Sequence, residues 1–380
     1  YLSGLVGSLD SFIFVRKIND RLVYSPSDLI NFIESPFASW MDRAMIEGME
    51  GACPDQEDEE RQLVAEEGNR HEENFLQSLL SEGANICEID PRGKSPVAET
   101  RAAILRKEEV IYQATLGLNE FRGNADFLFF NAEENHYEVW DTKLARKSKP
   151  YFMVQLCCYS EMLSHIQGVL PKRMGIVLGN DKRDEYLLDD FFDYYQRIKT
   201  EFLSMMNGWN ATNRPEPVAS AEHGRWSGTV KAWVLETDHL SQVAEIRTAQ
   251  IEKLRDAGID TLKKLATYTG APPKGMAEKV FLNLRQQAKL QQMTKDKKLS
   301  LPDEEEVVPP VYIAREKDET SQEPRGLELL PPFNPQDIFF DLEGFPLSKE
   351  GLEYLWGASF LDDSGNLDFK DWWAHDEKEE

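Results

Sequence analysis

Cysteine is scarce in this chain, and no cysteine spacing matches a metal-binding motif. The 380 residues include four cysteines, of which Cys157 and Cys158 are adjacent. No pair has the Cys-x-x-Cys spacing that is typical of zinc sites and redox centres. Because disulfides are rare in reducing compartments, this usage predicts a reduced, cytoplasmic chain.

Long hydrophobic runs are also missing. No stretch approaches the ~20 continuous apolar residues of a membrane helix, so we expect no membrane partner. Segment 2–15 is partly apolar, but Asp10 interrupts it and no basic region precedes it, which argues against a signal peptide. The chain starts at Tyr1 without Met and stops in an acidic run. We therefore expect a fragment of a longer protein.

Positive charge is in deficit: 43 Lys and Arg oppose 68 Asp and Glu, for a net charge of −25. This balance argues against a generic nucleic-acid-coating protein, because nonspecific affinity comes from neutralising phosphates. Arg146, Lys147 and Lys149 nevertheless cluster directly after Lys143. We call these three residues the basic lip and predict that they contact DNA. A solvated basic turn accounts for their charges nearly as well.

Two neighbouring apolar segments carry acidic residues. Asp126 lies in the predicted strand 121–130, and Asp141 and Lys143 lie in the predicted strand 137–144. Side chains alternate across a strand, so Asp141 and Lys143 share a face. A turn-like segment joins the two strands, so two carboxylates and one ammonium converge at a sheet surface. A divalent metal and a scissile phosphate require such an arrangement.

The surrounding pattern predicts an α/β fold. His71 lies on an amphipathic helix, and Gln155 and Tyr159 share a face of a later helix because they are four residues apart. The expected order after the His71 helix is strands 85–89, 110–116, 121–130 and 137–144, helix 150–164 and strand 174–178.

This α-β-β-β-α-β order, with the motifs on these elements, resembles the PD-(D/E)xK restriction-endonuclease-like core. In detail it resembles the RecB-like nucleases, and most closely the bacterial RecB-family nucleases that are fused to an RNase H-like exonuclease and a superfamily 1 helicase. The resemblance covers nearly the whole chain, and the motifs are specific in combination. Any one of them alone is weak.

The resemblance implies a role for each motif residue. Lys143 would orient the attacking water and neutralise charge on the phosphoryl group, and Gln155 and Tyr159 would support the site and touch the nucleic-acid backbone. Taken singly, His71 also fits a helix-surface histidine, and Gln155 and Tyr159 also fit core packing. Hard oxygen ligands favour Mg²⁺ or Mn²⁺ over zinc. The implied metal ligands are His71, Asp126, Asp141 and the carbonyl of Thr142.

Many RecB-like nucleases also hold an iron–sulfur cluster with one cysteine before the core and three after it. The matching positions here are Ser35, Ala221, Gly224 and Val230. Because none is a cysteine, we expect no cluster and expect packing to hold the two flanks together.

The chain beyond residue 230 changes character. Two short helices with an Ala-Gly-Ile turn resemble a helix-hairpin-helix unit, for which we favour a packing or spacer role over DNA contact. The predicted parts are a nuclease domain with helical flanks at 1–230, the helix-hairpin-helix-like segment at 231–294, a linker at 295–335, and the start of an RNase H-like domain at 336–380.

Asp341 and Glu343 lie two apart on an apolar strand in the last part. They resemble the opening motif of DEDD-type exonucleases and form a partial second site, although an ordinary acidic strand end is the alternative. Its remaining acids are expected beyond Glu380.

The function that we predict is a metal-dependent DNA nuclease module in DNA repair, recombination or processing, with a helicase domain in the same full-length chain. The competing hypothesis is a catalytically silent module that guides DNA to the helicase. An RNA-processing enzyme also remains possible, because the sequence does not reveal which sugar is recognised.

Overall fold

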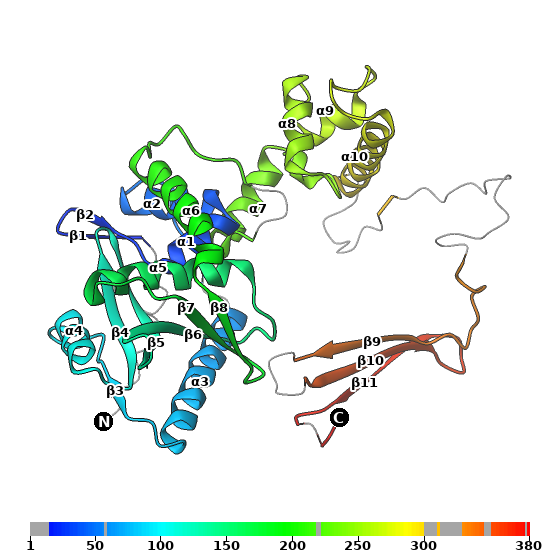
Figure 1. Cartoon of the computed structure of the whole chain (residues 1–380). Helices are drawn as coiled ribbons and strands as arrows, with labels where there is room; N and C mark the ends of the chain where they lie inside the picture. Colours follow the sequence, from blue (N-terminus) through cyan, green and yellow to red (C-terminus); the bar gives the residue numbers. More distant parts are fainter. Residues whose placement is uncertain are drawn as a thin grey trace. The chain divides into compact units, whose positions relative to one another are not determined.

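The computed structural model describes residues 15–56, 59–217, 222–299, 310–311, 329–345, 351–376 and 378–380, without the side chains of 59–61 and 299. The chain divides into two compact units, Tyr1–Arg285 and Gln286–Glu380 (Figure 1). Helix α10 (Glu278–Leu299) runs across this boundary.

The first unit is built around one mixed sheet. Its strands lie in the order β3-β4-β5-β6-β7-β8, with β3–β4 and β6–β7 parallel and the other neighbours antiparallel. The elements up to β8 are β1 (Arg16–Ile18), β2 (Arg21–Val23), α1 (Pro26–Glu34), α2 (Pro36–Ile46), α3 (Glu59–Ser81), β3 (Ile86–Glu88), α4 (Pro96–Arg106), β4 (Val110–Leu118), β5 (Phe121–Asn131), β6 (His136–Lys143), α5 (Pro150–Gln167), β7 (Arg173–Leu178) and β8 (Arg183–Leu187).

The predicted elements occur in the expected sequence order, as α3, β3, β4, β5, β6, α5 and β7. Two further elements of the sheet layer, α4 and β8, were not predicted. Strand β8 begins with Arg183, Asp184 and Glu185 and lies at the sheet edge, so it lacks the apolar alternation that reveals a strand.

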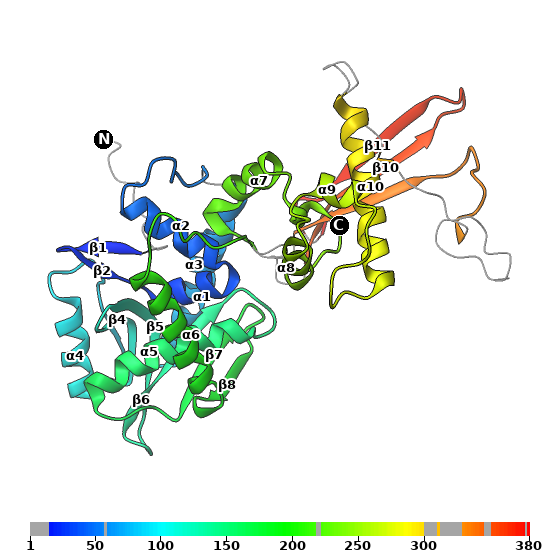
Figure 2. The same cartoon turned by 90° about the horizontal axis from the view of Figure 1, so that it is seen from above.

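Helices cover both faces of the sheet. Helix α5 lies across one face with α1 and α6 (Asp189–Asn207) beyond it, as Figure 2 shows from above. Leu128, Val139 and Ile176 pack into this α5-side core. Helix α3 covers the other face, where Phe75 and Phe127 belong to a separate α3-side core. Side-chain alternation along each strand supplies both cores.

Regular side-chain alternation is interrupted at one point in β4 and at the opposite point in β5. Beyond that point, the side chains of each strand lie on the other face of the sheet from the one that regular alternation predicts. Their pairing skips Gln113 and Asp126, and Gln113 has a left-handed backbone with φ of 55°. Regular alternation puts residues three apart on opposite faces. Here the α5-side core takes residues three apart in both strands, namely Ile111 and Ala114, and Leu128 and Ala125. We call this feature the paired irregularity.

Helix α1 begins with a capped N-terminus. Ser25 caps the helix and, with Asp28, forms a capping box: the Asp28 N–H donates to Ser25 Oγ at 3.3 Å, and the Ser25 N–H donates to Asp28 Oδ2 at 2.6 Å. Pro26 occupies the first turn, where its missing N–H has no cost.

A set of polar contacts joins the two segments that flank the six-stranded sheet layer. Ser35 Oγ lies 2.7 Å from His223 Nδ1, in buried surroundings. Asp42, on α2, accepts hydrogen bonds from Arg225 Nε at 2.9 Å, Trp226 Nε1 at 2.7 Å and Asn31 Nδ2 at 3.0 Å. We call the contacts of Ser35 and Asp42 the flank clasp. Of the positions compared with cluster cysteines, Ala221 lies outside the described residues.

The first unit continues with short helices. They are η2 (Gly224–Trp226), α7 (Ser227–Glu236), η3 (Leu240–Gln242), α8 (Thr248–Asp256) and α9 (Leu262–Thr267). Helices α8 and α9 with the intervening turn at Gly258 confirm the predicted pair of short helices. The predicted linker start at residue 295 was wrong, because α10 continues to Leu299. Most of the remaining linker lies outside the described residues.

The second unit contains a three-stranded antiparallel sheet in the order β11-β10-β9. Its strands are β9 (Phe339–Gly344), β10 (Glu353–Leu361) and β11 (Leu367–Trp373), and β9 confirms the predicted strand that carries Asp341 and Glu343. Large apolar side chains are exposed on both faces, including Phe339 at 64% on one and Trp372 at 46% on the other.

Across the part of the chain that the structure describes, no helix is both long enough and apolar enough to cross a bilayer.

Candidate active site

The candidate site lies where β5 and β6 separate. Their pairing runs from Asn131 and His136 to Phe127 and Trp140 and then ends. Asp126 follows at the next position. Its Oδ2 accepts hydrogen bonds from the Thr142 N–H at 2.9 Å and the Thr142 hydroxyl at 3.0 Å. The Asp126 carboxylate thus accepts the Thr142 N–H in place of a backbone carbonyl, and this contact joins β5 to β6 beside Asp141.

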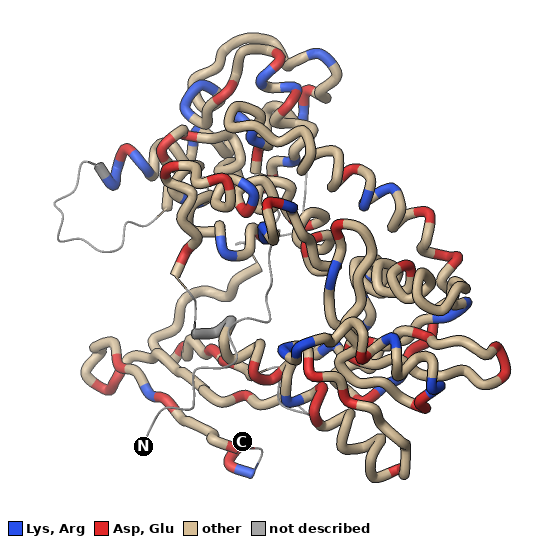
Figure 3. Tube along the Cα trace, turned by 90° about the vertical axis from the view of Figure 1, so that its left-hand side faces the viewer, with Lys and Arg blue, Asp and Glu red and all other residues tan. Residues whose placement is uncertain are grey.

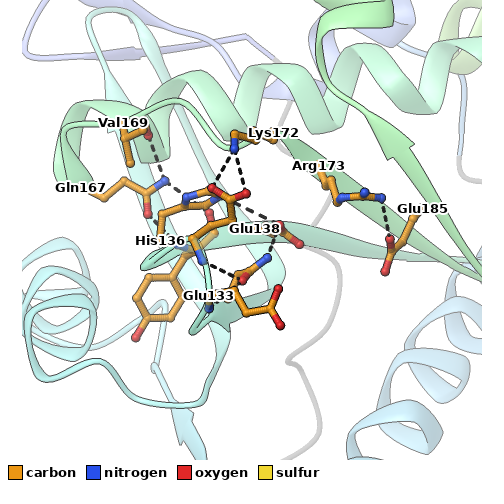
Figure 4. A network of polar contacts seen from close by, with 11 residues as sticks. Glu133, His136, Glu138, Gln167, Val169, Lys172, Arg173 and Glu185 are labelled. Atoms are coloured by element: carbon orange, nitrogen blue, oxygen red, sulfur yellow. Dashed lines mark hydrogen bonds and ion pairs between the residues drawn. The ribbon is translucent and has the colours of Figure 1, made fainter.

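The other end of β6 has a different set of partners (Figure 4). The Tyr137 N–H donates to Gln167 Oε1 at 2.8 Å, and Gln167 Nε2 donates to the Val169 carbonyl at 3.0 Å. Arg173 pairs with Glu185 at 3.2 Å on the neighbouring strands. Amide groups and ion pairs therefore surround the strand at this end.

Lys143 forms an ion pair with Asp141, as their shared strand face predicts. The Asp141 side chain is 3% exposed and that of Lys143 is 22% exposed. The Lys143 Nζ also lies 5.7 Å from the centre of the Phe152 ring on α5. The ammonium therefore stands between β6 and α5, with one side open to solvent.

The charges of the site act on one another. Burial raises the pKa of Asp126 well above its ordinary value, and the neighbouring charges of Asp141 and Glu72 raise it further. Burial by itself would lower the pKa of Lys143, but the charges of Asp141, Asp126 and Glu72 outweigh it, so this pKa is raised. The site therefore holds more carboxylates than cations and favours an added positive charge.

Helix α5 supplies the two residues that were expected to cover the site. Gln155 and Tyr159 are both buried and hydrogen-bonded to each other. Burial raises the pKa of Tyr159 well above its ordinary value, and the charges of Asp126 and Asp141 contribute. The structure therefore brings Tyr159 to the carboxylates. A Cβ built on Gly123 would lie 2.9 Å from the Tyr159 hydroxyl, so Gly123 leaves room for this ring.

Glu72 is a member of the site that the sequence did not reveal. Its carboxylate accepts hydrogen bonds from Gln113 and Tyr112 of β4. Burial raises its pKa, and the charge of Asp141 raises it further while Lys143 lowers it. One signal was present: Glu72, Leu76 and Leu79 have the i, i+4, i+7 spacing of one helix face, which places an acid on the apolar side of α3.

His71 contacts β7. Its Nε2 is 3.4 Å from the carbonyl oxygen of Val177, on the strand that pairs with β6. Among the described residues, no group of three or more His, Cys, Asp or Glu side chains is close enough to hold a metal ion. The structure thus brings Asp126, Asp141 and Lys143 together but does not add His71 to them as a ligand group. The raised pKa of Asp126 still fits a cation, because carboxylates that repel one another are stabilised by positive charge.

The basic lip connects β6 to α5. Arg146, Lys147 and Lys149 are all exposed, and the Lys149 Nζ lies 5.6 Å from the Tyr151 ring. Elsewhere, lysines and arginines are interspersed with acidic residues along the trace (Figure 3). In the lip, three basic residues fall within positions 146–149, shortly after Lys143 of the candidate site.

In the second unit, Asp341 and Glu343 share one face of β9, as predicted. Asp341 pairs with Gly357, which pairs in turn with Asp371 on β11, so the two aspartates fall in one cross-strand row. All three acids are exposed. Asp371 was not predicted, because only the strand register relates it to Asp341.

Comparison of the chain with protein-family models found no matching family. Comparison with curated protein sequences also found no match.

Proposed function

We propose that the first unit is a metal-dependent DNA nuclease with a PD-(D/E)xK core of the RecB-like type. The observation that carries this proposal is the convergence of Asp126, Asp141 and Lys143 where β5 and β6 separate. The α3-β4-β5-β6-α5-β7 order of the sheet layer supports it.

Mg²⁺ or Mn²⁺ would be the cofactor. Asp126, Asp141 and the Thr142 carbonyl would hold it, and His71, the fourth ligand expected from the sequence, contacts Val177 in this structure. When bound, such a cation lowers the pKa of a water and neutralises phosphoryl oxygens. Lys143 orients the water and stabilises charge that develops on the phosphoryl group. Tyr159 and Gln155 hold the carboxylates in place, and the basic lip binds the DNA backbone.

The second unit is, in this proposal, the start of an RNase H-like exonuclease domain, with Asp341 and Glu343 as part of its acidic site. The full-length protein would add a superfamily 1 helicase and act in DNA repair or recombination.

Cleavage of labelled single- and double-stranded DNA tests the proposal, with Mg²⁺, Mn²⁺ or EDTA. We expect metal-dependent cleavage that Asp141→Ala slows by several orders of magnitude, while the exposed Asp190→Ala cleaves like the parent. Cleavage in EDTA, or full activity of Asp141→Ala, would exclude this function.

A second function is favoured by one observation: Lys143 is paired with Asp141, the aspartate that the nuclease would need as a metal ligand. A chain with this arrangement as its resting state is a catalytically silent module that guides DNA. Calorimetry with Mn²⁺ separates the two functions. Metal binding that Asp126→Ala abolishes supports the nuclease, and DNA binding without Mn²⁺ binding supports the silent module.

A further inference from the structure

The Lys143 ammonium lies against an aromatic ring of α5. Its Nζ stands over Phe152, 5.7 Å from the centre of the ring. An ammonium within about 6 Å of a ring centre is attracted by the negative charge of the ring face. Lys143 thus contacts partners of two kinds, because it also forms an ion pair with Asp141 on its own strand.

The start of α5 fixes the position of this ring. Phe152 lies in the first turn, where its N–H donates to the Lys149 carbonyl at 3.0 Å and Pro150 restricts the backbone. The Phe152 side chain is buried in the α5-side core. The Tyr151 ring packs edge-on against it, with ring centres 4.9 Å apart and an angle of 86° between the planes. The ring beside Lys143 is therefore held by packing on a helix rather than by a loop.

Phe152 belongs to the helix face that covers the candidate site. Phe152, Gln155 and Tyr159 have the i, i+3, i+7 spacing of one face of a helix, and all three are buried. Gln155 and Tyr159 already have an expected role at the site. Their face of α5 therefore also supplies the ring that meets the ammonium.

The two partners of Lys143 differ in what else they bind. In the proposed function, Asp141 is also a metal ligand, and a carboxylate that shares its charge with a metal ion attracts the ammonium less. A ring face does not compete for the metal ion, because hard cations prefer oxygen ligands. It also leaves the N–H donors of the ammonium available to the water and to the phosphoryl oxygens.

We infer that Phe152 is a positioning residue for Lys143, and that its ring keeps the ammonium in the site while Asp141 engages a metal ion. This inference rests on the proposed nuclease function and adds one residue to its machinery. Phe152 acts through Lys143 and needs no contact with DNA.

The test weakens the charge of the ring face and leaves the shape of the core nearly unchanged. Increasing numbers of fluorine atoms on the Phe152 ring withdraw electron density and reduce its attraction for a cation. In single-turnover cleavage with Mn²⁺, we expect a stepwise loss of rate that reaches about 10-fold for the most fluorinated ring. Calorimetry should show the parental Mn²⁺ affinity throughout the series.

Phe202 is the matched control. It is a fully buried ring of the same core and packs edge-on against Tyr24, with ring centres 4.9 Å apart. The same fluorine series at Phe202 changes a ring contact of the same kind that does not include Lys143, and it should leave the rate at the parental value. A parental rate throughout the Phe152 series would overturn the inference. Equal losses of rate at Phe152 and Phe202 would overturn it as well.

Folding stability gives a readout that needs no activity. A double-mutant cycle combines the most fluorinated Phe152 with Lys143→Met, and we expect non-additive free energies of unfolding in urea, since the ring and the ammonium interact in the folded state. A parent that cleaves no DNA would refute the nuclease function, and non-additive free energies would then leave the Phe152–Lys143 contact standing. Additive free energies in a parent that cleaves DNA would refute only this inference.

Discussion

Lys143 and Lys147 carry the same charge four residues apart, but their surroundings differ. Lys143 is paired with the buried Asp141, whereas Lys147 belongs to the exposed basic lip. A guanidinium is longer and planar, so it replaces an ammonium poorly where geometry matters and well where only charge matters. We predict that Lys143→Arg binds Mn²⁺ and DNA like the parent but cleaves at least ~100-fold more slowly.

Lys147→Arg is the control and should cleave at the parental rate in the same single-turnover assay. If Lys143→Arg cleaved at the parental rate, Lys143 would contribute only its positive charge, as the basic lip does, and would have no role in catalysis.

Asp28 makes folding stability depend on pH. Burial raises its pKa from 3.8 to about 7, although hydrogen bonds from Ser25 act in the opposite direction. The folded state therefore favours the neutral acid. Its stabilising contribution is complete below the unfolded pKa near 4 and is lost as the pH rises through about 7. A shift of about three pKa units corresponds to about 4 kcal/mol.

Asp28→Asn keeps an acceptor for the Ser25 N–H and removes the ionisation. We predict that urea unfolding at pH 8 shows a more stable Asp28→Asn than parent, and that the difference shrinks towards pH 4. Asp190→Asn, at an exposed position in the first turn of α6, should leave the pH dependence of the parent unchanged. An identical pH dependence for parent and Asp28→Asn would contradict the role of Asp28.

Among the elements, α3 and β5 each contain a glycine near the site, and the two should respond oppositely to alanine. A Cβ at Gly68 on α3 meets only Leu144 at 4.0 Å, so Gly68→Ala should stabilise the helix by about 0.5–1 kcal/mol.

A Cβ at Gly123 on β5 would lie 3.0 Å from Pro26 and 2.9 Å from the Tyr159 hydroxyl. Gly123→Ala should destabilise by about 1–3 kcal/mol and slow cleavage, because Tyr159 must move. Urea unfolding and single-turnover cleavage check both variants. If the two variants changed the free energy of unfolding in the same direction, the result would be inconsistent with this packing.

The flank clasp joins α2 to η2, the short helix directly before α7. The Asp42 side chain is fully buried and pairs with Arg225 at 2.8 Å. Removing one partner of a buried ion pair leaves a charge without compensation, so we predict that Arg225→Met costs about 3–5 kcal/mol in urea unfolding. Arg173→Met breaks the exposed pair with Glu185 and should cost below about 1 kcal/mol. Similar costs for the two variants would show that the clasp contributes no more than a surface contact.

Sequence patterns predicted the elements that are clearly apolar. Strands β5 and β6 were found because both segments are apolar and a turn-like segment joins them. Strand β8 was missed because its edge position tolerates charged residues. The same limit applies to the site. Asp141 and Lys143 are neighbours in sequence and could be paired from strand geometry, whereas Glu72 meets them only through a helix from another part of the chain. The left-handed Gln113 follows no sequence rule, because a glutamine rarely adopts that conformation.

For the molecule as a whole, a net charge of −25 opposes DNA binding, so binding must depend on local positive charge. Each phosphate neutralised by a basic residue adds about 0.9 to the slope of log affinity against log salt. We predict that Lys147→Ala, measured in EDTA to prevent cleavage, lowers this slope by about 0.9. Lys172→Ala, at the far end of β6 and paired with Glu134, should keep the parental slope. An unchanged slope for Lys147→Ala would remove the basic lip from the DNA-binding surface.

The paired irregularity sets a rule for changes in chain length. Gln113 and Asp126 face each other, and the pairs on either side, Tyr112 with Phe127 and Ala114 with Ala125, keep one register. Loss of one residue alone would leave the other as an extra residue with none opposite it, as in a β-bulge, and the pairs on either side would keep their faces. Loss of both would join two regular stretches and restore alternation, but it would also delete the aspartate that anchors Thr142. A variant that lacks both Gln113 and Asp126 would therefore lose the acidic site and keep a regularly paired sheet.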